Sequence, residues 1–432
     1  MIQNAEVYLW GTRIGIVHQD EVSGIISFEY DKDFVRSNIQ VSPFKMPLSN
    51  SIYTFPELSN TSFKGLPGLL SDSLPDKFGN AVIDKWLISQ GRNPDSFTAI
   101  ERLCYTGKRG MGALEYVPSN GPVSDSELSI DVNEMVKFAS EILSGKENLS
   151  YNSKDITMQQ MLEFGTSAGG ARAKAVIAWN NKTGEVRSGQ TENDESFEQW
   201  IIKFDGVSNN GDHNIKDKKQ YTLVEYAYYL MAKDFGIDMN ECRIYNKDGL
   251  NHFMTKRFDR NNGNKIHMQT FSALCHYDYN IPCLTGYKEL AAYGRRLGIL
   301  SYDVEQIYRR MVFNCKTFNM DDHVKNVSFL MDKKGVWSLS PAYDLTYAYK
   351  PGNKWISKHQ MTVNGKNDNI TDDDIITVGR DMGLSGQKCK KILEQANIVV
   401  PMWKNYAEKC GISEEIAAII DSNINKYNIN DV

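Results

Sequence analysis

The chain has no run of residues long and apolar enough to span a membrane, and it lacks an excess of charge of one sign. Its 432 residues carry 49 Lys and Arg against 54 Asp and Glu, a net charge of -5. This balance argues against a protein whose whole surface neutralises nucleic acid. The first residues, Met1 to Glu6, lack the basic and apolar regions of a signal peptide. We therefore expect a cytoplasmic protein that does not use a membrane.

Cysteine is also scarce, and no two cysteines have the spacing Cys-x-x-Cys. The seven cysteines are scattered at positions 104, 242, 275, 283, 315, 389 and 410. Disulfide frameworks and zinc sites need cysteines paired at short spacings, so we expect reduced thiols that pack in the interior. Internal repeats and low-complexity tracts are missing as well. The length exceeds what one core supports, which predicts two or more domains.

The hydrophobic pattern changes along the chain. Residues 6–10, 14–17 and 24–30 predict three short strands, and residues 81–89 predict a helix after a Gly- and Pro-rich stretch. The polar segment 118–127 is the best candidate for a first domain boundary.

The rest of the chain divides into a second β-rich part and a helical part. Residues 175–179 and 200–204 predict strands, and residues 221–235 predict an amphipathic helix. After Lys256 the pattern is mostly helical, interrupted by one hairpin over 328–331 and 336–339. Thr371 and Asp374 predict a capping box for a helix that ends at Gly383, and Ser413 starts a last apolar helix through Ile420.

The most informative segment is residues 319–326, Asn-Met-Asp-Asp-His-Val-Lys-Asn, which follows an amphipathic helix. The predicted hairpin then returns a third carboxylate, Asp344, to the same end of the fold. Phosphoryl transfer from Mg-ATP needs such a set of side chains. Asp321 would orient and deprotonate the acceptor hydroxyl, while Asn326 and Asp344 would hold the metal.

Two other interpretations of this segment stay open when it is taken alone. One is a polar loop between helix and hairpin, since such loops often contain Asp and Asn. The other is a two-metal hydrolase that would use Asp321, Asp322 and His323.

A glycine-rich stretch precedes the strand at 175–179. Residues 165–174 read Gly-Thr-Ser-Ala-Gly-Gly-Ala-Arg-Ala-Lys, and these glycines let backbone N–H groups approach phosphates. The spacing of Gly165 and Gly170 resembles a Walker A loop, but Ala171 and Arg172 stand where that motif has Lys and Ser or Thr. Taken alone, such a stretch is more often an ordinary turn.

Lys203 lies inside an apolar strand, where a lysine must reach water or meet a negative charge. Kinases use such a lysine on the nucleotide phosphates and pair it with a helix glutamate. Glu225, in the next predicted helix, is the nearest candidate, and a water-facing edge-strand lysine is the alternative. Along the chain these parts come in the order Gly-rich loop, strand lysine, helix glutamate, Asp-x-His-x-x-Asn, hairpin and Asp. This order predicts a two-lobed kinase.

Motifs along nearly the whole chain resemble those of the HipA-type serine/threonine kinase toxins of bacterial toxin–antitoxin modules. They include Leu66-Pro67-Gly68, Ser71 to Asp76, Thr106 to Leu114, Ser167 to Lys174, Ile202-Lys203-Phe204, Lys256 to Arg260, Asp321 to Asn326, and Pro341 to Asp344. The resemblance implies an α+β, protein-kinase-like fold with two lobes. A β-rich N-terminal domain would cover residues 1–117, a kinase N-lobe 128–255, and a helical C-lobe 256–432.

The resemblance also implies the roles of individual residues at a Mg-ATP site. Asp321 would be catalytic, Asn326 and Asp344 would hold Mg²⁺, and Lys203 would contact the phosphates. The loop that covers the phosphates would be Gly169, Gly170, Ala171, Arg172, Ala173 and Lys174. The hinge that meets adenine through its backbone would be Lys256, Arg257 and Phe258. The ATP site would further be lined by His323, Lys325 and Tyr343.

The chain departs from the family at two of these places. The studied hinge has an acidic residue where this chain has Lys256, so a backbone contact is expected there. The phosphate loop carries Ala171-Arg172-Ala173 as a local variant. Ser167 matches the serine whose autophosphorylation switches these kinases off. A phosphate there would place about two negative charges where the nucleotide phosphates bind.

Family members bind a helix-turn-helix antitoxin dimer and, through it, operator DNA. Their best-known substrate is glutamyl-tRNA synthetase, so the resemblance implies a translation-linked protein substrate. One alternative is a kinase for a lipid or small molecule, which the lack of a membrane-binding segment disfavours. The other is a catalytically silent co-repressor, which would not need Lys203, Asp321, Asn326 and Asp344 together.

Overall fold

The computed structural model describes residues 2–121, 129, 131–143, 172–190, 194–207, 220–261 and 263–429, with side chains to residue 425. Four predicted site residues lie outside this part of the chain: Ser167, Gly169, Gly170 and Ala171. Most of the predicted boundary at 118–127 lies outside it too.

The N-terminal part contains an antiparallel sheet with the strand order β4-β3-β2-β1-β5. Its strands are β1 (Asn4–Leu9), β2 (Thr12–Gln19), β3 (Ile26–Tyr30), β4 (Ile52–Thr54) and β5 (Leu114–Val117). Trp10 and Gly11 join β1 to β2 with φ angles of 50° and 81°. Positive φ at both central residues is the geometry of a type I′ turn, whose twist matches the flanking strands.

Helices make up much of the same N-terminal part. They are α1 (Lys32–Val35), α2 (Gly68–Ser71), α3 (Lys77–Ser89) and α4 (Ala99–Thr106), with a 3₁₀ turn η1 (Pro94–Ser96). The predicted helix at 81–89 is therefore one turn longer at its start, because the carboxylate of Asp76 caps it by accepting from the N–H of Gly79.

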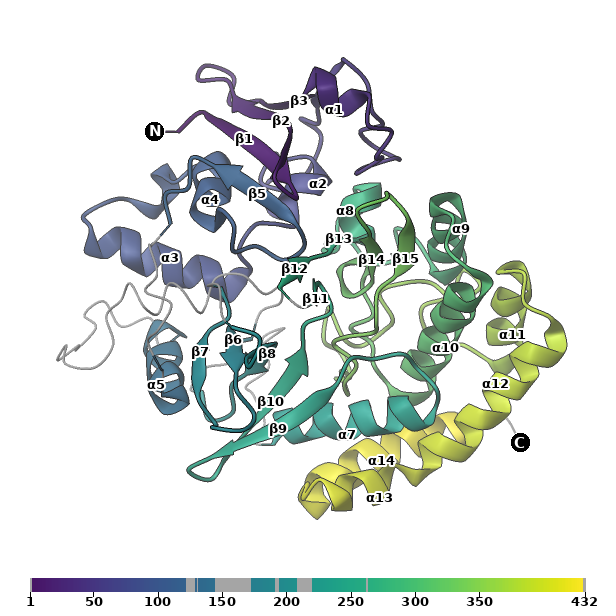
Figure 1. Cartoon of the computed structure of the whole chain (residues 1–432). Coiled ribbons are helices and arrows are strands. Elements are labelled where there is room, and N and C mark those ends of the chain that lie inside the picture. The colour runs from purple at the N-terminus through teal and green to yellow at the C-terminus, as the bar shows by residue number, and fades with distance from the viewer. Residues whose placement is uncertain are drawn as a thin grey trace.

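A second antiparallel sheet has the strand order β7-β6-β8-β10-β9. Its strands are β6 (Lys174–Trp179), β7 (Val186–Ser188), β8 (Glu198–Lys203), β9 (Cys242–Lys247) and β10 (Leu250–Lys256). Figure 1 shows α7 (Tyr221–Asp234) beside β9 and β10, with which it is in contact. A further helix, α5 (Val132–Leu143), packs on α3. The hairpin β9–β10 and helix α5 were not predicted from the sequence.

The C-terminal part holds the predicted hairpin and one strand more. β14 (Ser328–Met331) pairs with β15 (Trp337–Leu339) and also with β13 (His267–Thr270), so the expectation of a lone hairpin after Lys256 was wrong. A two-stranded ribbon of β11 (Arg260–Asn261) and β12 (Asn264–Lys265) comes before β13. Strand β13 was not predicted from the sequence, because its partner strand lies about sixty residues away along the chain.

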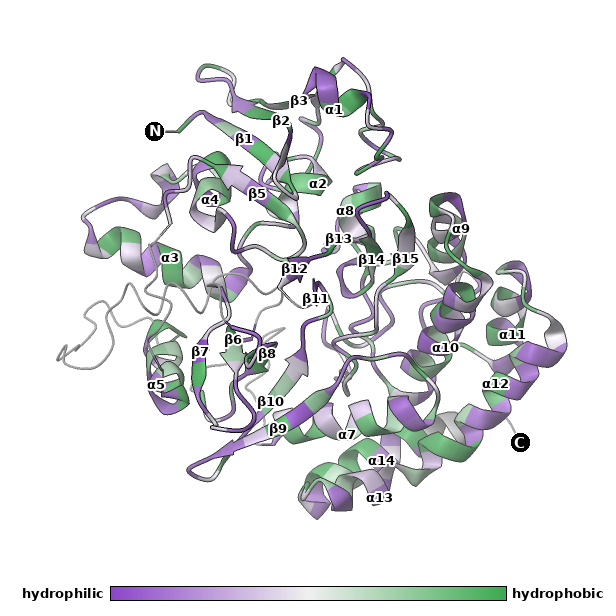
Figure 2. Cartoon of the chain, in the orientation of Figure 1, coloured by the Kyte–Doolittle hydropathy of each residue, from purple (hydrophilic) through white to green (hydrophobic). Residues whose placement is uncertain are grey.

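The rest of the C-terminal part is mostly helical. Its helices are α8 (Phe271–Cys275), α9 (Tyr287–Leu297), α10 (Ser301–Thr317), α11 (Asp372–Asp381), α12 (Gly386–Val399), α13 (Trp403–Lys409) and α14 (Glu414–Ile429), with 3₁₀ turns η2 (Val324–Asn326) and η3 (Val400–Met402). Of these, α8 and α9 contact the three-stranded sheet. The capping box of Thr371 and Asp374 is present on α11. Along α12 to α14 hydrophobic and hydrophilic residues alternate, as in helices with one packed face (Figure 2).

Two large hydrophobic cores hold these parts together. One joins the N-terminal sheet to helices of the C-terminal part, so that Val7 and Phe28 belong to the same buried cluster as Phe313 and Trp403. The other joins α3 and α5 to the sheet around β6 and β8. Among the helices that the structure describes, none has the length and hydrophobicity needed to cross a bilayer.

Candidate active site

A cavity of about 940 Å³ lies where the three parts of the chain meet. Its wall includes residues of the α2–α3 segment, of the sheet around β6, β8 and β10, and of the loop that follows α10. The predicted site residues that line it are Arg172, Lys174, Lys203, Lys256, Arg257, Phe258, Asp321, His323, Lys325, Asn326, Tyr343 and Asp344. The structure thus brings together the described members of the predicted site except Ala173, which is buried in the hydrophobic core around β6 and β8.

Lys203, the last residue of β8, lies at the centre of a cluster of charged side chains in this cavity. Its Nζ donates to Oε1 of Glu225 at 2.6 Å, and it also donates to Oδ1 of Asp344. The expected pair of a strand lysine with a helix glutamate is therefore present. The cluster joins β8, α7 and the segment after β15 into one charged network.

Burial and charge act in opposite directions on the pKa values of this cluster. Burial alone would lower the pKa of Lys203, but Asp344 and Glu225 outweigh it and raise that pKa. Burial would raise the pKa of Asp344, whereas Lys203 and Lys174 lower it below its usual range. The pKa of Glu225 is raised because burial exceeds the attraction of Lys203. Lys203 thus stays charged, and Asp344 stays ionised beside it.

The loop after α10 presents the predicted catalytic aspartate. Helix α10 ends at Phe318, whose φ of 57° turns the chain sharply out of the helix. Nδ2 of Asn326 donates to the backbone oxygen of Asp321 at 2.8 Å and closes the loop on itself. Nε2 of His323 lies 3.9 Å from Oδ1 of Asp321. Asp321 and Asn326 are thereby fixed on the same short turn.

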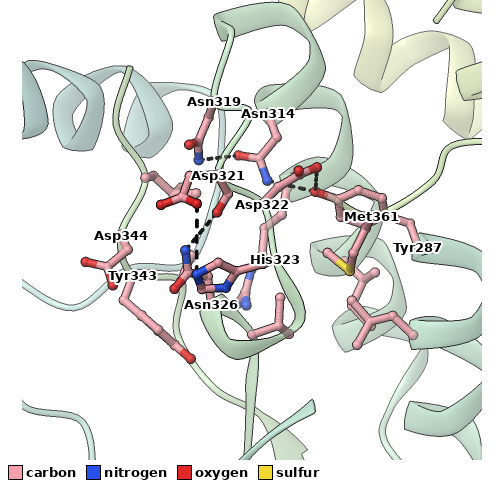
Figure 3. A pocket seen from close by; sticks show the side chains of 16 residues that line it. Tyr287, Asn314, Asn319, Asp321, Asp322, His323, Asn326, Tyr343, Asp344 and Met361 are labelled. Carbon is pink, nitrogen blue, oxygen red and sulfur yellow. Dashed lines mark hydrogen bonds and ion pairs between the residues drawn. The ribbon is translucent and has the colours of Figure 1, made fainter. Parts of the chain in front are cut away.

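The neighbouring residue Asp322 points the opposite way, into the protein (Figure 3). Its carboxylate accepts hydrogen bonds from the hydroxyl of Tyr287 at 2.8 Å and the backbone N–H of Gln360 at 2.7 Å, and Nδ1 of His359 lies 2.9 Å away. These contacts saturate Asp322 and anchor the loop. The two-metal hydrolase, which needs Asp322 as a ligand, is therefore not supported.

Tyr343 fixes the segment that carries Asp344. Its hydroxyl lies 2.6 Å from Oγ of Ser328 and donates to the backbone oxygen of Lys325 at 2.8 Å. Its ring lies 5.7 Å from the ring of Phe258, centroid to centroid. Asp344 itself has a φ of 53°, a value that few residues other than glycine adopt. Tyr343 therefore links the hinge, the catalytic loop and Asp344.

The predicted hinge uses its side chains for structure. The ammonium group of Lys256 pairs with Glu198, and the guanidinium of Arg257 donates twice to the carboxylate of Asp259, at 2.9 and 2.7 Å. Asp259 also accepts from Arg260 and from the backbone N–H of Gly112, both at 2.7 Å. These side chains are engaged, and so are the backbone N–H groups of Lys256 and Arg257, which donate to the backbone oxygens of Glu241 and Gln199 at 2.8 and 2.9 Å. The contact of Asp259 with the N-terminal part was not predicted from the sequence.

The start of β6 supplies further cations. The guanidinium carbon of Arg172 lies 3.1 Å from the ring centroid of Tyr221, and Lys174 is buried with its Nζ 3.5 Å from Oδ2 of Asp76. Asp76 belongs to the N-terminal Ser-Asp-Ser-Leu-Pro-Asp motif, which sequence reasoning used for the family resemblance alone. Neither its cap on α3 nor its contact with Lys174 was predicted from the sequence.

One end of the cavity suits a hard divalent cation. Asn326 uses its Nδ2 within the loop, so its Oδ1 is the atom available as a ligand, and Asp344 offers an ionised carboxylate. Mg²⁺ prefers such oxygen ligands and completes its shell with phosphate and water. The two residues fit Mg²⁺. Over the ranges that the structure describes, no three His, Cys, Asp or Glu side chains group into a site for a metal.

The fold and this site define an α+β, two-lobed, kinase-like protein with an additional N-terminal domain. Two family models match the sequence: the HipA N-terminal domain over residues 5–117 and the HipA-like C-terminal domain over residues 166–422. The chain belongs to the HipA family.

Individual relatives are more distant. The sequence is 29% identical over 163 residues to the "Putative kinase Y4dM" of Sinorhizobium fredii (strain NBRC 101917 / NGR234), covering 34% of this chain and 36% of that protein. The chain thus spans about a third of that relative. The structure is similar to a chain of the Shewanella oneidensis MR-1 toxin–antitoxin complex of HipA, HipB and operator DNA. The TM-score is 0.64 at 16% identity, over 98% of this chain and 95% of that one.

Proposed function

We propose that this HipA-family chain is a Mg-ATP-dependent serine/threonine protein kinase and the toxin of a type II toxin–antitoxin pair. One observation carries the proposal. Lys203 is paired with both Glu225 and Asp344 in the cavity that Asp321 and Asn326 also line. A lysine–glutamate pair beside a metal-binding aspartate and a catalytic loop is the arrangement that protein kinases need for phosphoryl transfer.

Each residue of the site has its own role in the proposed phosphoryl transfer. The oxygen of the acceptor hydroxyl forms a bond to the γ-phosphorus, and Asp321 accepts the proton of that hydroxyl. The bond from the γ-phosphorus to the oxygen of ADP breaks. Lys203 balances negative charge on the phosphates, and Glu225 holds Lys203 in place. Asn326 and Asp344 would hold Mg²⁺, which neutralises charge on the phosphates when bound. The backbone of residues 256–258 would meet the adenine.

The same proposal covers the partners and the self-modification that the family resemblance implies. We propose a helix-turn-helix antitoxin dimer, with operator DNA reached through it, because the family resemblance implies them and the similar Shewanella structure is a complex of HipA, HipB and operator DNA. We propose a translation-linked protein as substrate and Ser167 as the site of autophosphorylation.

Autophosphorylation with Mg²⁺ and terminally labelled ATP tests this function. Wild type is compared with Asp321→Asn and Ser167→Ala, and the label is mapped by mass spectrometry. We expect label at Ser167 in wild type and a loss of about 10²-fold or more in Asp321→Asn, the usual effect of removing a general base. Folded wild type that binds ATP and transfers nothing to itself or to a cell lysate would favour a lipid or small-molecule kinase. Absence of ATP binding would favour a silent co-repressor.

A further inference from the structure

We propose that Asp76 of the N-terminal domain is a positioning residue of the nucleotide site, holding the ammonium group of Lys174 where a phosphate of ATP binds. The inference rests on the proposed function, because it takes Lys174 as part of the phosphate site. It adds that the N-terminal domain completes this site through a carboxylate of its own.

Asp76 uses its two carboxylate oxygens for different tasks. Oδ1 accepts from the backbone N–H of Gly79 at 2.5 Å and caps helix α3, while Oδ2 lies 3.5 Å from Nζ of Lys174. The side chains of Asp76 and Lys174 are only 3% and 4% exposed. Removal of either charge would leave the other buried without this partner, which is costly in a protein interior.

Lys174 needs such a partner because another lysine lies next to it. Lys174 in β6 is directly opposite Lys203 in the antiparallel register with β8. Residues directly opposite each other in such a pair point to the same face of the sheet, and like charges there repel. Lys203 is balanced by Glu225 and Asp344. Asp76 gives Lys174 a counter-charge from a different domain.

The position of Asp76 is fixed by packing. It precedes α3, whose Phe78, Val82 and Ile83 are buried in the same core as Ile177 and Ile202 of the sheet. The helix therefore cannot shift along β6 without disturbing this core. Asp76 is held at a set distance from the start of β6, as a positioning role requires.

The charges around Lys174 determine how it responds to pH. Burial lowers the pKa of Lys174, while Asp76 and Asp344 raise it and Lys203 lowers it further. Burial raises the pKa of Asp76 to about 6, although Lys174 opposes this. Nζ of Lys174 and Oδ2 of Asp76 lie within ion-pair distance, at 3.5 Å. Without the Asp76 charge, the pKa of Lys174 falls further.

The variant Asp76→Asn isolates this effect, because asparagine still caps a helix but carries no charge. Binding of Mg²⁺ with a non-hydrolysable ATP analogue is measured by calorimetry on the full chain between pH 6.5 and 9, in buffers of different ionisation enthalpy. We expect a Kd about tenfold higher for Asp76→Asn at pH 8, equivalent to one lost charge contact. We also expect binding to take up more protons than in wild type, as Lys174 regains its charge.

Two further variants separate positioning from folding. Asp84→Asn removes a carboxylate of the same helix that pairs with Arg102 at 3.0 Å, and we expect wild-type affinity and proton uptake from it. Asp76→Glu restores the charge and should restore part of the affinity. In turnover assays Asp76→Asn should raise KM for ATP with little change in kcat, since a phosphate contact made throughout the reaction affects binding alone.

The outcomes distinguish failure of this inference from failure of the proposed function. If wild type does not bind the analogue, the proposed function fails. If wild type binds and Asp76→Asn binds equally well or more tightly, with unchanged proton uptake, the role of Asp76 is refuted.

If Asp76→Asn does not fold, the double variant Asp76→Asn with Lys174→Met decides, because it removes both buried charges together. A folded double variant supports the pairing of the two side chains. An unfolded one shows that Asp76 serves the fold alone and overturns the inference.

Discussion

Adjacent aspartates in the loop after α10 have opposite environments. Asp321 lines the cavity, while Asp322 is buried and held by Tyr287, His359 and Gln360. The sequence Asp-Asp alone does not reveal which of the two side chains lines the cavity. The phosphoryl-transfer pattern and the family resemblance both predicted Asp321 as the base, and that role stays a prediction. The contacts of Asp322 show that it anchors the loop.

This difference predicts opposite effects of two isosteric substitutions. Asp322→Asn leaves the charge of His359 buried without its partner, so we expect it to lower the free energy of unfolding by about 3–5 kcal/mol. Asp321→Asn should change that free energy by about 1 kcal/mol or less, because the Asp321 side chain lines the cavity and is 23% exposed. Urea unfolding of both variants measures this. Equal stabilities would contradict the anchoring role of Asp322.

His359 makes the stability of the chain depend on pH. Burial would lower its pKa, but the carboxylate of Asp322 outweighs burial and raises it well above the usual value. A raised pKa means that folding favours the charged imidazole. Its stabilisation is fully present below the unfolded pKa, about 6.5, and is lost as the pH rises through the folded value.

The expected result is a wild-type unfolding free energy that declines above neutrality more steeply than that of His359→Gln. Urea unfolding at intervals from pH 5 to 10 measures it. Parallel curves for the two proteins would show that the charge of His359 does not contribute.

At the scale of elements, contacts between α2 and α8 join the N-terminal domain to the C-terminal part. Gly68 of α2 lies so close to α8 that a Cβ atom would collide with the backbone of Ala273. Its N–H donates to Nε2 of His276 at 3.0 Å. The Leu-Pro-Gly motif is thus explained by a close approach of two backbones, which requires glycine.

Gly68→Ala should therefore destabilise the chain by about 1–3 kcal/mol, the cost of overpacking a tight contact. Gly184→Ala is the matched control. Gly184 has a φ of 75° and nothing within 4 Å of a Cβ, so that substitution tests backbone strain alone. Thermal unfolding compares the two variants. A loss in Gly68→Ala no larger than in Gly184→Ala would show that the α2–α8 contact can relax.

Elements that depend on local signals were predicted, and elements that depend on distant partners were not. The hairpin β14–β15 and the capping box on α11 follow from neighbouring residues. Strand β13 and the contact between Asp76 and Lys174 form only once separate parts of the chain meet. At the site, Lys203 and Glu225 were predicted because kinase chemistry requires the pair. Asp76 was missed because no local pattern marks it.

At the scale of the whole molecule, buried charges connect the domains as firmly as the core does. Asp259 accepts from Arg257, from Arg260 and from Gly112 of the N-terminal part. Burial would raise the pKa of Asp259, but the two arginines hold it well below its usual range. A lowered pKa stabilises the fold above the unfolded value, and this stabilisation is lost as the pH falls through the folded one.

Asp259→Asn should thus lower the free energy of unfolding by about 3–5 kcal/mol at pH 7. The difference from wild type should shrink only as the pH falls below the unfolded pKa of about 3.9 and toward the lower folded one. Chemical unfolding at pH 7 and at about pH 2 measures both. A difference that stays constant with pH would show that shape, and not charge, matters at this position.

The shared core also bears on how the chain is made. Val7 and Phe28 belong to the same buried cluster as Phe313 and Trp403, which the ribosome adds much later. At about 5–20 residues per second, the N-terminal domain waits for tens of seconds before its partners exist. Lys203, Glu225, Asp321 and Asp344 come together in the same late step. Under the proposed function, an unfinished chain that lacks Asp344 would therefore transfer no phosphate.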